Sequence, residues 1–463
     1  MNAFTDVIAA VSTPPGKGGV AIIRISGNGA FDIAESVFVA KSGKKIAEVP
    51  PRVQIYGDIV EDGEVIDDVL LTRFPAPGSY TGEDTAEIAC HGGMLVTRTV
   101  LEAVLRHGAR PAEAGEFTRR AFLNGRMSLT EAEAVGGLLD ATSREQIRLT
   151  ASPSRARLAA RIDRIRKMIT EMLSSVYARI DYPDEDLGDF TDAQLLERIN
   201  EAKCEVGELL ATYRTGRAIS EGIDTVLCGK PNVGKSSVYN LLVGDDAAIV
   251  TDIPGTTRDL LKQQIPLGRV MLKLCDTAGV RADSSDAVEA IGIEKSRKMI
   301  EKCELLFTIF DLSRPFDNED AELVELIKST KSAKIAILNK SDLSEEFDES
   351  RIDGIFDATV RISAKDDDGE AIRALTAIVD HLFTDERIRV GEDAVISSAR
   401  QHAALTRGLD FLNVAVESLA LGYAQDAVSS DLEHALGAIS EIDGRAVSED
   451  VVADIFSKFC VGK

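Results

Sequence analysis

The sequence predicts a multidomain protein with an α+β N-terminal domain, an all-α helical domain and an α/β domain inserted into the helical one. Three observations lead to this prediction. Short β-rich runs alternate with Gly- and Pro-containing turns near the N-terminus, and apolar residues then recur at three- and four-residue spacing. From Gly222 onward, short apolar strands alternate with helical stretches, which is typical of a parallel, doubly wound sheet.

The helical pattern resumes after the α/β block, at about Val395. One helical domain interrupted by an insertion explains this order, because the ends of a compact domain often lie close together. Two independent helical domains are the alternative. We expect an N-terminal domain at 1–120, the two parts of the helical domain at 121–219 and 385–463, and the inserted domain at 220–384.

Composition limits the class of protein. The chain has 463 residues and a net charge of −24, with no apolar run of the length that crosses a membrane and no secretory signal. The acidic balance disfavours non-specific nucleic-acid binding by the whole surface. The six cysteines show no CxxC spacing, which argues against a zinc site or a disulfide framework and favours the cytoplasm.

The strongest motif is GKPNVGKS, which begins at Gly229 and ends at Ser236. It matches the pattern G-x-x-x-x-G-K-[ST] and lies between a strand, DTVLCG, and a helical stretch, SSVYNLLVG. The glycines let backbone N–H groups surround phosphate oxygens, Lys235 is placed to reach the β- and γ-phosphates, and Ser236 to bind Mg²⁺. We therefore expect a nucleotide site here.

Three further motifs lie in order at the ends of later strands. DTAG (276–279) places Asp276 to hold Mg²⁺ through water and its glycine to donate an N–H to the γ-phosphate. NKSD (339–342) places the carboxylate of Asp342 to accept two hydrogen bonds from guanine, which adenine does not offer. The backbone of SAK (363–365) can meet guanine O6. Together the motifs predict a Ras-like P-loop GTPase domain.

The stretch TDIPGTTRD (251–259) lies between the phosphate loop and DTAG, where a nucleotide-dependent switch is expected. Thr257 is the expected second protein ligand of Mg²⁺. Val280 stands where Ras-like proteins have the Gln that orients the attacking water. Acidic residues in 281–294, a cation or a partner must then complete the site, so we expect slow turnover that rises on dimerisation or partner binding.

The first block holds a second cluster, formed by Arg24, Glu83, His91 and Arg126, with glycines close by. Charged groups in such a setting suggest a pocket for an anionic heterocyclic ligand, and solvated loop residues are the alternative. His91 is expected to be structural rather than catalytic.

Two other features leave alternatives open. Arg157, Arg161 and Arg164 lie near one face of a helical stretch, where they would either meet RNA phosphates or, the favoured interpretation, form a solvated face. Cys460, in the terminal FCVGK, is either a small buried hydrophobe or a reactive thiol.

The whole chain resembles the bacterial MnmE (TrmE) family of tRNA modification GTPases. Several of the motifs that carry the resemblance are not shared with generic small GTPases. The most specific are TPPGKGGVAIIRISG, SYTGEDTAEIACHGG, GEFTRRAFLNGRMSLTEAEAV, DYPDED, GKPNVGKSS, TDIPGTTRD, DTAGVRADSSDAVEAIGIE and FCVGK.

The resemblance implies that the N-terminal domain binds a one-carbon tetrahydrofolate, such as the 5-formyl form, and builds a homodimer. The folate-contacting positions of the family fall on Arg24, Glu83, Arg126 and Lys463. The family often has Lys where this chain has Arg126, which keeps the charge but changes its geometry. The family also has Pro where this chain has Ala114, with only a loop effect expected.

The resemblance also implies a GTPase activated when the G domains dimerise around K⁺. The K⁺ positions fall on Asn232, Thr251, Ile253 and Thr256, and the catalytic glutamate on Glu289. Together with the flavoprotein MnmG, in a heterotetramer, family members add a carboxymethylaminomethyl or aminomethyl-type group to C5 of the wobble uridine (position 34) of certain tRNAs. The C-terminal cysteine of the family maps to Cys460, which with Glu289 and Lys235 completes the expected catalytic set. The expected GTP/GDP-binding residues are Asn232, Val233, Gly234, Lys235, Ser236, Ser237, Thr251, Asp252, Ile253, Pro254, Gly255, Thr256, Thr257, Asp276, Thr277, Ala278, Gly279, Asn339, Lys340, Asp342, Ser363, Ala364 and Lys365.

Two alternatives belong to other classes. A ribosome-assembly GTPase would share the PGTTRD switch but lack the glycine-rich N-terminal block and the terminal Cys-x-Gly-Lys. A folate-dependent enzyme with a regulatory G domain would need a clear acid–base set in the first block, which the sequence does not offer.

Overall fold

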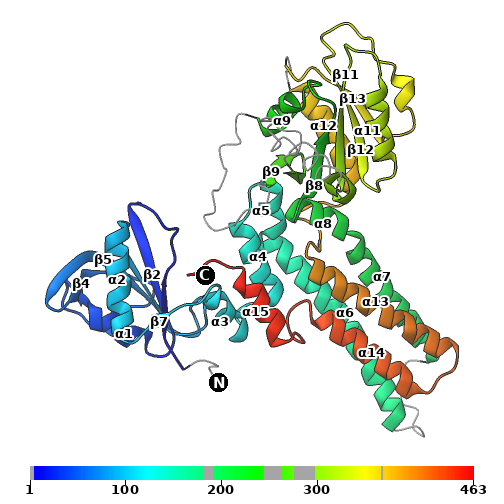
Figure 1. Cartoon of the computed structure of the whole chain (residues 1–463). Helices are drawn as coiled ribbons and strands as arrows, with labels where there is room; N and C mark the ends of the chain where they lie inside the picture. Colours follow the sequence, from blue (N-terminus) through cyan, green and yellow to red (C-terminus); the bar gives the residue numbers. More distant parts are fainter. Residues whose placement is uncertain (1–4, 182–190, 245–261, 276–297, 366–368, 463) are drawn as a thin grey trace. The chain divides into compact units, whose positions relative to one another are not determined.

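The structure, a computed structural model, groups the chain into two compact units (Figure 1). The first comprises residues up to Leu139 together with Ser440 and the residues after it, and the second is Asp140–Ile439. No described helix is long and apolar enough to cross a membrane. The domain boundaries expected from the sequence stay predictions. The structure describes residues 5–181, 191–244, 262–275, 298–365 and 369–462.

A seven-stranded sheet in the order β3-β4-β5-β6-β2-β1-β7 forms the centre of the first unit. All neighbours are antiparallel except β1 and β7, which run parallel. Ile23 and Ile25, with Arg24 between them on β2, share a core with Val100 of α2, so α2 covers this face of the sheet. The strands are Ile8–Val11 (β1), Val20–Ser26 (β2), Phe38–Ala40 (β3), Gln54–Glu61 (β4), Glu64–Phe74 (β5), Thr85–His91 (β6) and Arg110–Pro111 (β7), and the covering helices are Ala30–Val37 (α1) and Met94–Arg106 (α2), with a short 3-10 turn at Ile46–Glu48.

Three more helices complete this unit: α3 (Glu116–Leu123), α4 (Leu129–Leu139) and α15 (Glu449–Ser457). Leu129 of α4 shares a small apolar core with Phe456 of α15. Residues near the C-terminus therefore pack with residues from the first third of the chain.

Long helices make up the first part of the second unit. The expected apolar stripe lies on α6, where Ile162, Ile165 and Ile169 are all buried, so the helical periodicity predicted there is confirmed. α6 packs on α7, and α7 on α13, which comes after the α/β block in the chain. The helices are Arg144–Thr150 (α5), Ser152–Asp181 (α6), Asp192–Ala211 (α7), Tyr213–Ser220 (α8), Ala399–Ala420 (α13) and Gln425–Ser440 (α14).

The α/β part of this unit holds a six-stranded sheet in the order β13-β12-β11-β8-β10-β9. All neighbouring pairs are parallel except β10 and β9. Val238 of α9 and Leu375 of α12 pack into one apolar core, whereas Ile327 of α11 packs into another. The doubly wound fold class is therefore confirmed. The elements are Ile223–Cys228 (β8), Lys235–Val243 (α9), Lys262–Leu267 (β9), Val270–Cys275 (β10), Leu305–Asp311 (β11), Asn318–Lys328 (α11), Ala333–Asn339 (β12), Glu349–Ile352 (a 3-10 turn), Ala358–Arg361 (β13) and Glu370–Phe383 (α12).

Candidate functional site

The phosphate-loop motif forms a tight turn between the end of β8 and the start of α9. Gly234 has a φ of 99°, and a Cβ placed there would lie 2.1 Å from Asn339 Nδ2. Gly229 has a φ of 152°, and its Cβ would lie 2.5 Å from the Ile309 carbonyl oxygen. Only glycine allows the backbone to approach its neighbours this closely, so the two glycines are required by the turn itself.

Lys235 and Ser236 occupy the first turn of α9, where unpaired backbone N–H groups favour anions. Lys235 Nζ donates to the carbonyl oxygens of Gly229, at 2.8 Å, and Lys230, at 2.7 Å. Burial lowers the pKa of this ammonium group. Ser236, Ser237 and Asn232 are exposed, and Val233 is buried beneath the loop. The loop therefore presents its polar groups to solvent from a fixed backbone.

Asn339, at the end of β12, connects the phosphate loop to the SAK segment. Its Nδ2 donates to the Val233 carbonyl oxygen at 2.9 Å, and its Oδ1 accepts the Ala364 N–H at 3.0 Å. The side chain is buried, with 3% of its surface exposed. Asp342 Oδ1 accepts the hydroxyl hydrogen of Ser363 at 2.9 Å. Three motifs far apart in the sequence thus meet at the carboxyl ends of parallel strands, as open α/β sheets require of a ligand site.

Asp311 adds a contact that the sequence motifs do not indicate. Its Oδ2 accepts a hydrogen bond from Lys340 Nζ at 2.6 Å, and its Oδ1 accepts one from the Ser313 hydroxyl at 2.6 Å. Burial acts to raise the pKa of Asp311, but these hydrogen bonds outweigh it and the pKa is lowered. The one feature of the sequence that could have indicated Asp311 as a site residue is its position at the end of the strand ELLFTIFD.

Several expected residues lie outside the described part of the chain, so their places in the site stay predictions. They include Val280, the catalytic candidate Glu289 and the folate candidate Lys463. The others are the switch residues Thr251, Asp252, Ile253, Pro254, Gly255, Thr256 and Thr257 and the DTAG residues Asp276, Thr277, Ala278 and Gly279. Lys365 lies within the described part and is exposed.

In the first unit, Arg24 lies within β2, and Glu83 contacts Ser26, the last residue of the same strand. Arg24 Nε donates to Glu87 at 2.9 Å, and its guanidinium lies 5.3 Å from the Tyr80 ring centre. Glu83 is 1% exposed and accepts a hydrogen bond from the Ser26 hydroxyl at 3.0 Å. Arg126 is exposed, and its Cγ would lie 3.0 Å from a Cβ on Gly82, beside Glu83.

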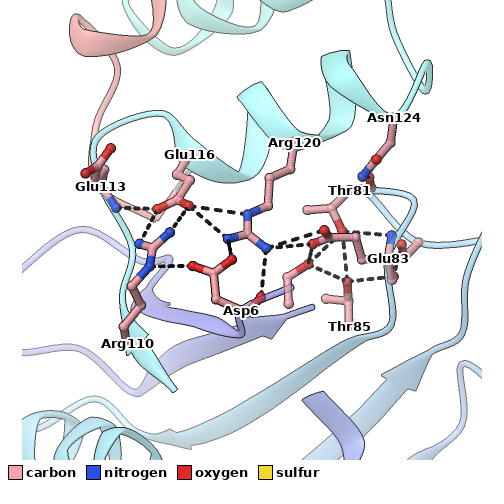
Figure 2. A network of polar contacts seen from close by, with 11 residues as sticks. Asp6, Thr81, Glu83, Thr85, Arg110, Glu113, Glu116, Arg120 and Asn124 are labelled. Carbon is pink, nitrogen blue, oxygen red and sulfur yellow. Dashed lines mark hydrogen bonds and ion pairs between the residues drawn. The ribbon is translucent and has the colours of Figure 1, made fainter. Parts of the chain in front are cut away.

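An ionic network centred on Arg120 includes Glu83 (Figure 2). Arg120, Glu83 and Glu116 are buried, whereas the side chains of Asp6 and Arg110 are 41% and 42% exposed. Arg120, on α3, has no exposed surface and contacts three acidic residues: Asp6 Oδ1 at 2.9 Å, Glu116 Oε1 at 3.0 Å and Glu83 Oε2 at 3.3 Å. Arg110 pairs with Glu116 and Asp6 in turn. Arg120 is not among the residues that the sequence motifs indicate, because the four-residue spacing from Glu116 predicts a helix-surface pair rather than burial.

His91 and Cys460 are both exposed. His91 Nδ1 lies 2.7 Å from Asp67 Oδ1, and this hydrogen bond raises the pKa of His91. For Cys460, the interpretation as a buried hydrophobe is therefore wrong. Its carbonyl oxygen accepts the Gly115 N–H at 3.3 Å.

The basic face of α6 is paired with acidic residues. Arg161 Nε donates to Glu205 Oε2 at 2.7 Å and also pairs with Glu208, while Arg164 pairs with Glu205 at 3.4 Å. Arg157 donates to a backbone carbonyl oxygen. These contacts support the interpretation as a solvated, charge-compensated face.

Two family models match the chain, and together they cover most of it. The GTP-binding protein TrmE N-terminus matches residues 7–126, and the MnmE helical domain matches residues 129–460. Proteins named tRNA modification GTPase MnmE from Clostridioides difficile and Acetivibrio thermocellus are each 39% identical to the chain over 460 residues, covering 99% of both sequences. One from Thermotoga maritima is 39% identical over 461 residues, covering 99% of this chain and 100% of its own length.

Matches of this identity and coverage, at both ends of the chain and through the site just described, leave one assignment. The chain belongs to the MnmE family of tRNA modification GTPases.

Proposed function

We propose that this protein binds and hydrolyses GTP and uses the reaction to drive the modification of tRNA. The observation that carries the proposal is the contact set of Asn339, whose amide joins the phosphate loop to the segment that would meet guanine. Separately, Asp342 accepts one hydrogen bond from Ser363, and the remaining lone pairs of its two carboxylate oxygens would accept the two hydrogen bonds from guanine.

Mg²⁺ fits the donors beside the phosphate loop. Ser236 is an exposed hydroxyl at the start of α9, and hard oxygen ligands of this kind suit Mg²⁺. We propose Ser236 and Thr257 as its protein ligands. The ion would neutralise charge on the phosphates, while Lys235 would turn from the loop carbonyls toward them.

We propose further that K⁺ binds through Asn232, Thr251, Ile253 and Thr256, and that Glu289 orients the attacking water. Val280 cannot orient the attacking water, because a valine side chain neither donates nor accepts a hydrogen bond. This supports the proposal that other groups complete the catalytic site. K⁺ would supply positive charge where other GTPases use an arginine. Dimerisation of the G domains would complete the site.

For the first unit we propose a folate site that uses Arg24, Glu83, Arg126 and Lys463, with 5-formyl-tetrahydrofolate or a related one-carbon folate as ligand. Support comes from Arg24, which lies over the Tyr80 ring, and from the exposed Arg126 near Gly82. Cationic side chains suit the carboxylates of a folate.

At the level of the assembly, we propose a cytoplasmic homodimer formed through the N-terminal domain. It would act with the flavoprotein MnmG on C5 of the wobble uridine of certain tRNAs, with Cys460 as a functional thiol. A chain with a net charge of −24 fits a partner that carries most of the tRNA-binding surface.

Replacing Asp342 by Asn tests guanine recognition directly. D342N should weaken GTP binding by at least about a hundredfold and favour xanthosine triphosphate, because the amide matches the xanthine edge and no longer accepts two hydrogen bonds from guanine. Equilibrium titration with labelled nucleotides measures both affinities. D348N, an exposed Asp in the same unit, is the matched control. An unchanged preference for GTP would refute the proposed role of Asp342.

Comparing GTP hydrolysis in K⁺ and Na⁺ tests the proposed activation. The rate per molecule should be at least about tenfold higher in K⁺ and should rise with protein concentration, since each G domain would need a second copy. GTP affinity measured in both salts separates binding from hydrolysis. Equal, concentration-independent rates would remove K⁺ and dimerisation from the proposal.

A further inference from the structure

The side chain of Lys230, inside the phosphate loop, is held by two aspartates at the start of α11. Its Nζ lies 2.6 Å from Asp317 Oδ2 and 2.7 Å from Asp320 Oδ2. The Lys230 side chain is 13% exposed and that of Asp320 is 4% exposed. Ion pairs with one partner this deeply buried are screened less by solvent than surface pairs.

The two aspartates are fixed by α11 independently of Lys230. Asp317 is the N-cap of the helix, and its Oδ1 accepts the N–H groups of Glu319 at 3.0 Å and Asp320 at 3.2 Å. Asp320 Oδ2 accepts the Asp317 N–H at 3.2 Å in return. This reciprocal capping box orders both carboxylates at the helix N-terminus. Lys230 therefore binds to a preformed acceptor.

The backbone of Lys230 is part of the phosphate loop and also contacts Lys235. Its carbonyl oxygen accepts a hydrogen bond from Lys235 Nζ at 2.7 Å. The side chain of Lys230 is thus tied to α11, while its carbonyl oxygen contacts Lys235 in the conformation that the loop has before Lys235 turns toward the phosphates. Because the backbone of Lys230 forms part of the loop, fixing its side chain on α11 also restricts the loop backbone at this position.

The connection between β11 and α11 also holds the base-reading side of the site. Leu312 N–H donates to the Asn339 carbonyl oxygen at 3.0 Å, and Asp311 pairs with Lys340. This short connection therefore supports the phosphate loop at one end, through Asp317, and the NKSD motif at the other.

We propose that Lys230, anchored by Asp317 and Asp320, is a positioning residue that preorganises the phosphate loop for guanine nucleotides. The inference rests on the proposed GTP binding. A loop already held in its binding shape loses less conformational freedom when the ligand arrives, which favours affinity. Lys230 also balances two carboxylates that would otherwise repel the phosphates.

Variants at Lys230 and Asp320 test the anchor. K230M keeps the aliphatic stem and should raise the Kd for both GTP and GDP by about tenfold. D320N retains an oxygen for capping and should raise the Kd for both nucleotides by about threefold. The double variant K230M/D320N should bind no more weakly than K230M, because the second change removes an uncompensated negative charge. K230R should restore most of the affinity.

Measurement of nucleotide Kd and of the KM–kcat split separates positioning from a general structural role. KM for GTP should rise more than kcat falls. The matched control is the exposed pair Lys328–Glu325 on the same helix, where K328M and E325Q should leave nucleotide affinity unchanged. Thermal unfolding of each variant identifies any that fail to fold, and D320N, whose helix cap is kept, then decides the question.

The outcomes are distinguishable. An unmodified protein that binds no guanine nucleotide refutes the proposed function itself. An unmodified protein that binds GTP while K230M and D320N bind it equally well refutes the anchor alone. Strictly additive losses in K230M/D320N would also overturn the inference, since residues that act through one contact do not contribute independently.

Discussion

Arg120 has no exposed surface, although an arginine is almost never wholly buried unless its charge is paired. Its partners Asp6, Glu83 and Glu116 supply three carboxylates, and Arg110 supplies a second guanidinium (Figure 2). A buried ionic network is not in itself a large source of stability, but removal of one partner leaves an uncompensated charge. The main effect of the network is therefore specificity: each charged side chain must keep its partner, so Asp6, Glu83 and Glu116 must all be placed around Arg120.

The pKa of Glu116 makes this constraint testable by pH. Burial acts to raise its pKa above 4.5, but hydrogen bonds from Arg110, from the Glu113 N–H and from Arg120 outweigh burial, and the pKa is lowered. The stabilisation is therefore complete above pH 4.5 and is lost as the pH falls through the folded-state value. E116Q should lower the local stability of α3 by about 3 kcal/mol at pH 7. It should also make that stability depend less on pH in the acidic range.

Hydrogen exchange of α3 amides, corrected for its intrinsic pH dependence, measures this local stability between pH 7 and pH 3. As a control, E102Q removes one partner of the exposed pair Arg98–Glu102 and should change the local stability of α3 little. An E116Q protein with the acid sensitivity of the parent would show that the Glu116 contacts do not govern the transition.

At the scale of elements, the segment after α15 is held against other parts of the first unit, including β1, by contacts to its backbone. Val461 pairs with Ala114, and the Ser12 hydroxyl donates to the Gly462 carbonyl oxygen at 3.1 Å. Gly462 has a φ of 95°, and a Cβ there would lie 2.2 Å from the Val11 carbonyl oxygen. Glycine is therefore the residue that lets the segment lie this close to β1.

G462A should release this segment from β1. The backbone conformation costs a non-glycine residue about 1–2 kcal/mol, and the clash with Val11 adds to that cost. Removal of the last residues by a carboxypeptidase should therefore become about tenfold faster or more. Gly422 has a φ of 68° with nothing within 4 Å of its Cβ position, so G422A is a control that carries strain without a clash. Equal rates in G462A and the parent would show that the close approach is not needed.

At the scale of the molecule, both units are assembled from segments distant in the chain. Residues from Ser440 group with the N-terminal strands, and α13 packs on α7 across the whole α/β block. Such insertions are tolerated because the entropy of loop closure grows only slowly with loop length. Part of the excess of acidic residues is paired locally, because Glu205 and Glu208 form ion pairs with the basic face of α6.

Local motifs made much of the nucleotide site predictable. The phosphate loop, Asn339 and Asp342 each follow a short apolar strand, and parallel strands bring their carboxyl ends to one edge. The apolar stripe of α6 was predictable for a similar reason, because helical periodicity is carried by neighbouring residues.

Contacts between distant residues were not predictable in this way. Asp6 and Arg120 meet across 114 positions, Lys230 and Asp320 across 90, and Ser12 and Gly462 across 450. The spacing of residues along the sequence does not indicate which charged side chains will be paired in the folded protein.

The sequence by itself thus determined the phosphate loop, the guanine-reading motifs and the multidomain fold class, because turn chemistry and periodicity are local properties. Only the tertiary structure decided that Arg120 is enclosed by Asp6, Glu83 and Glu116, that Lys230 is anchored on α11 and that Gly462 lies against β1. Burial and charge pairing depend on where the folded chain brings separate segments together, and that is settled by packing rather than by spacing along the sequence.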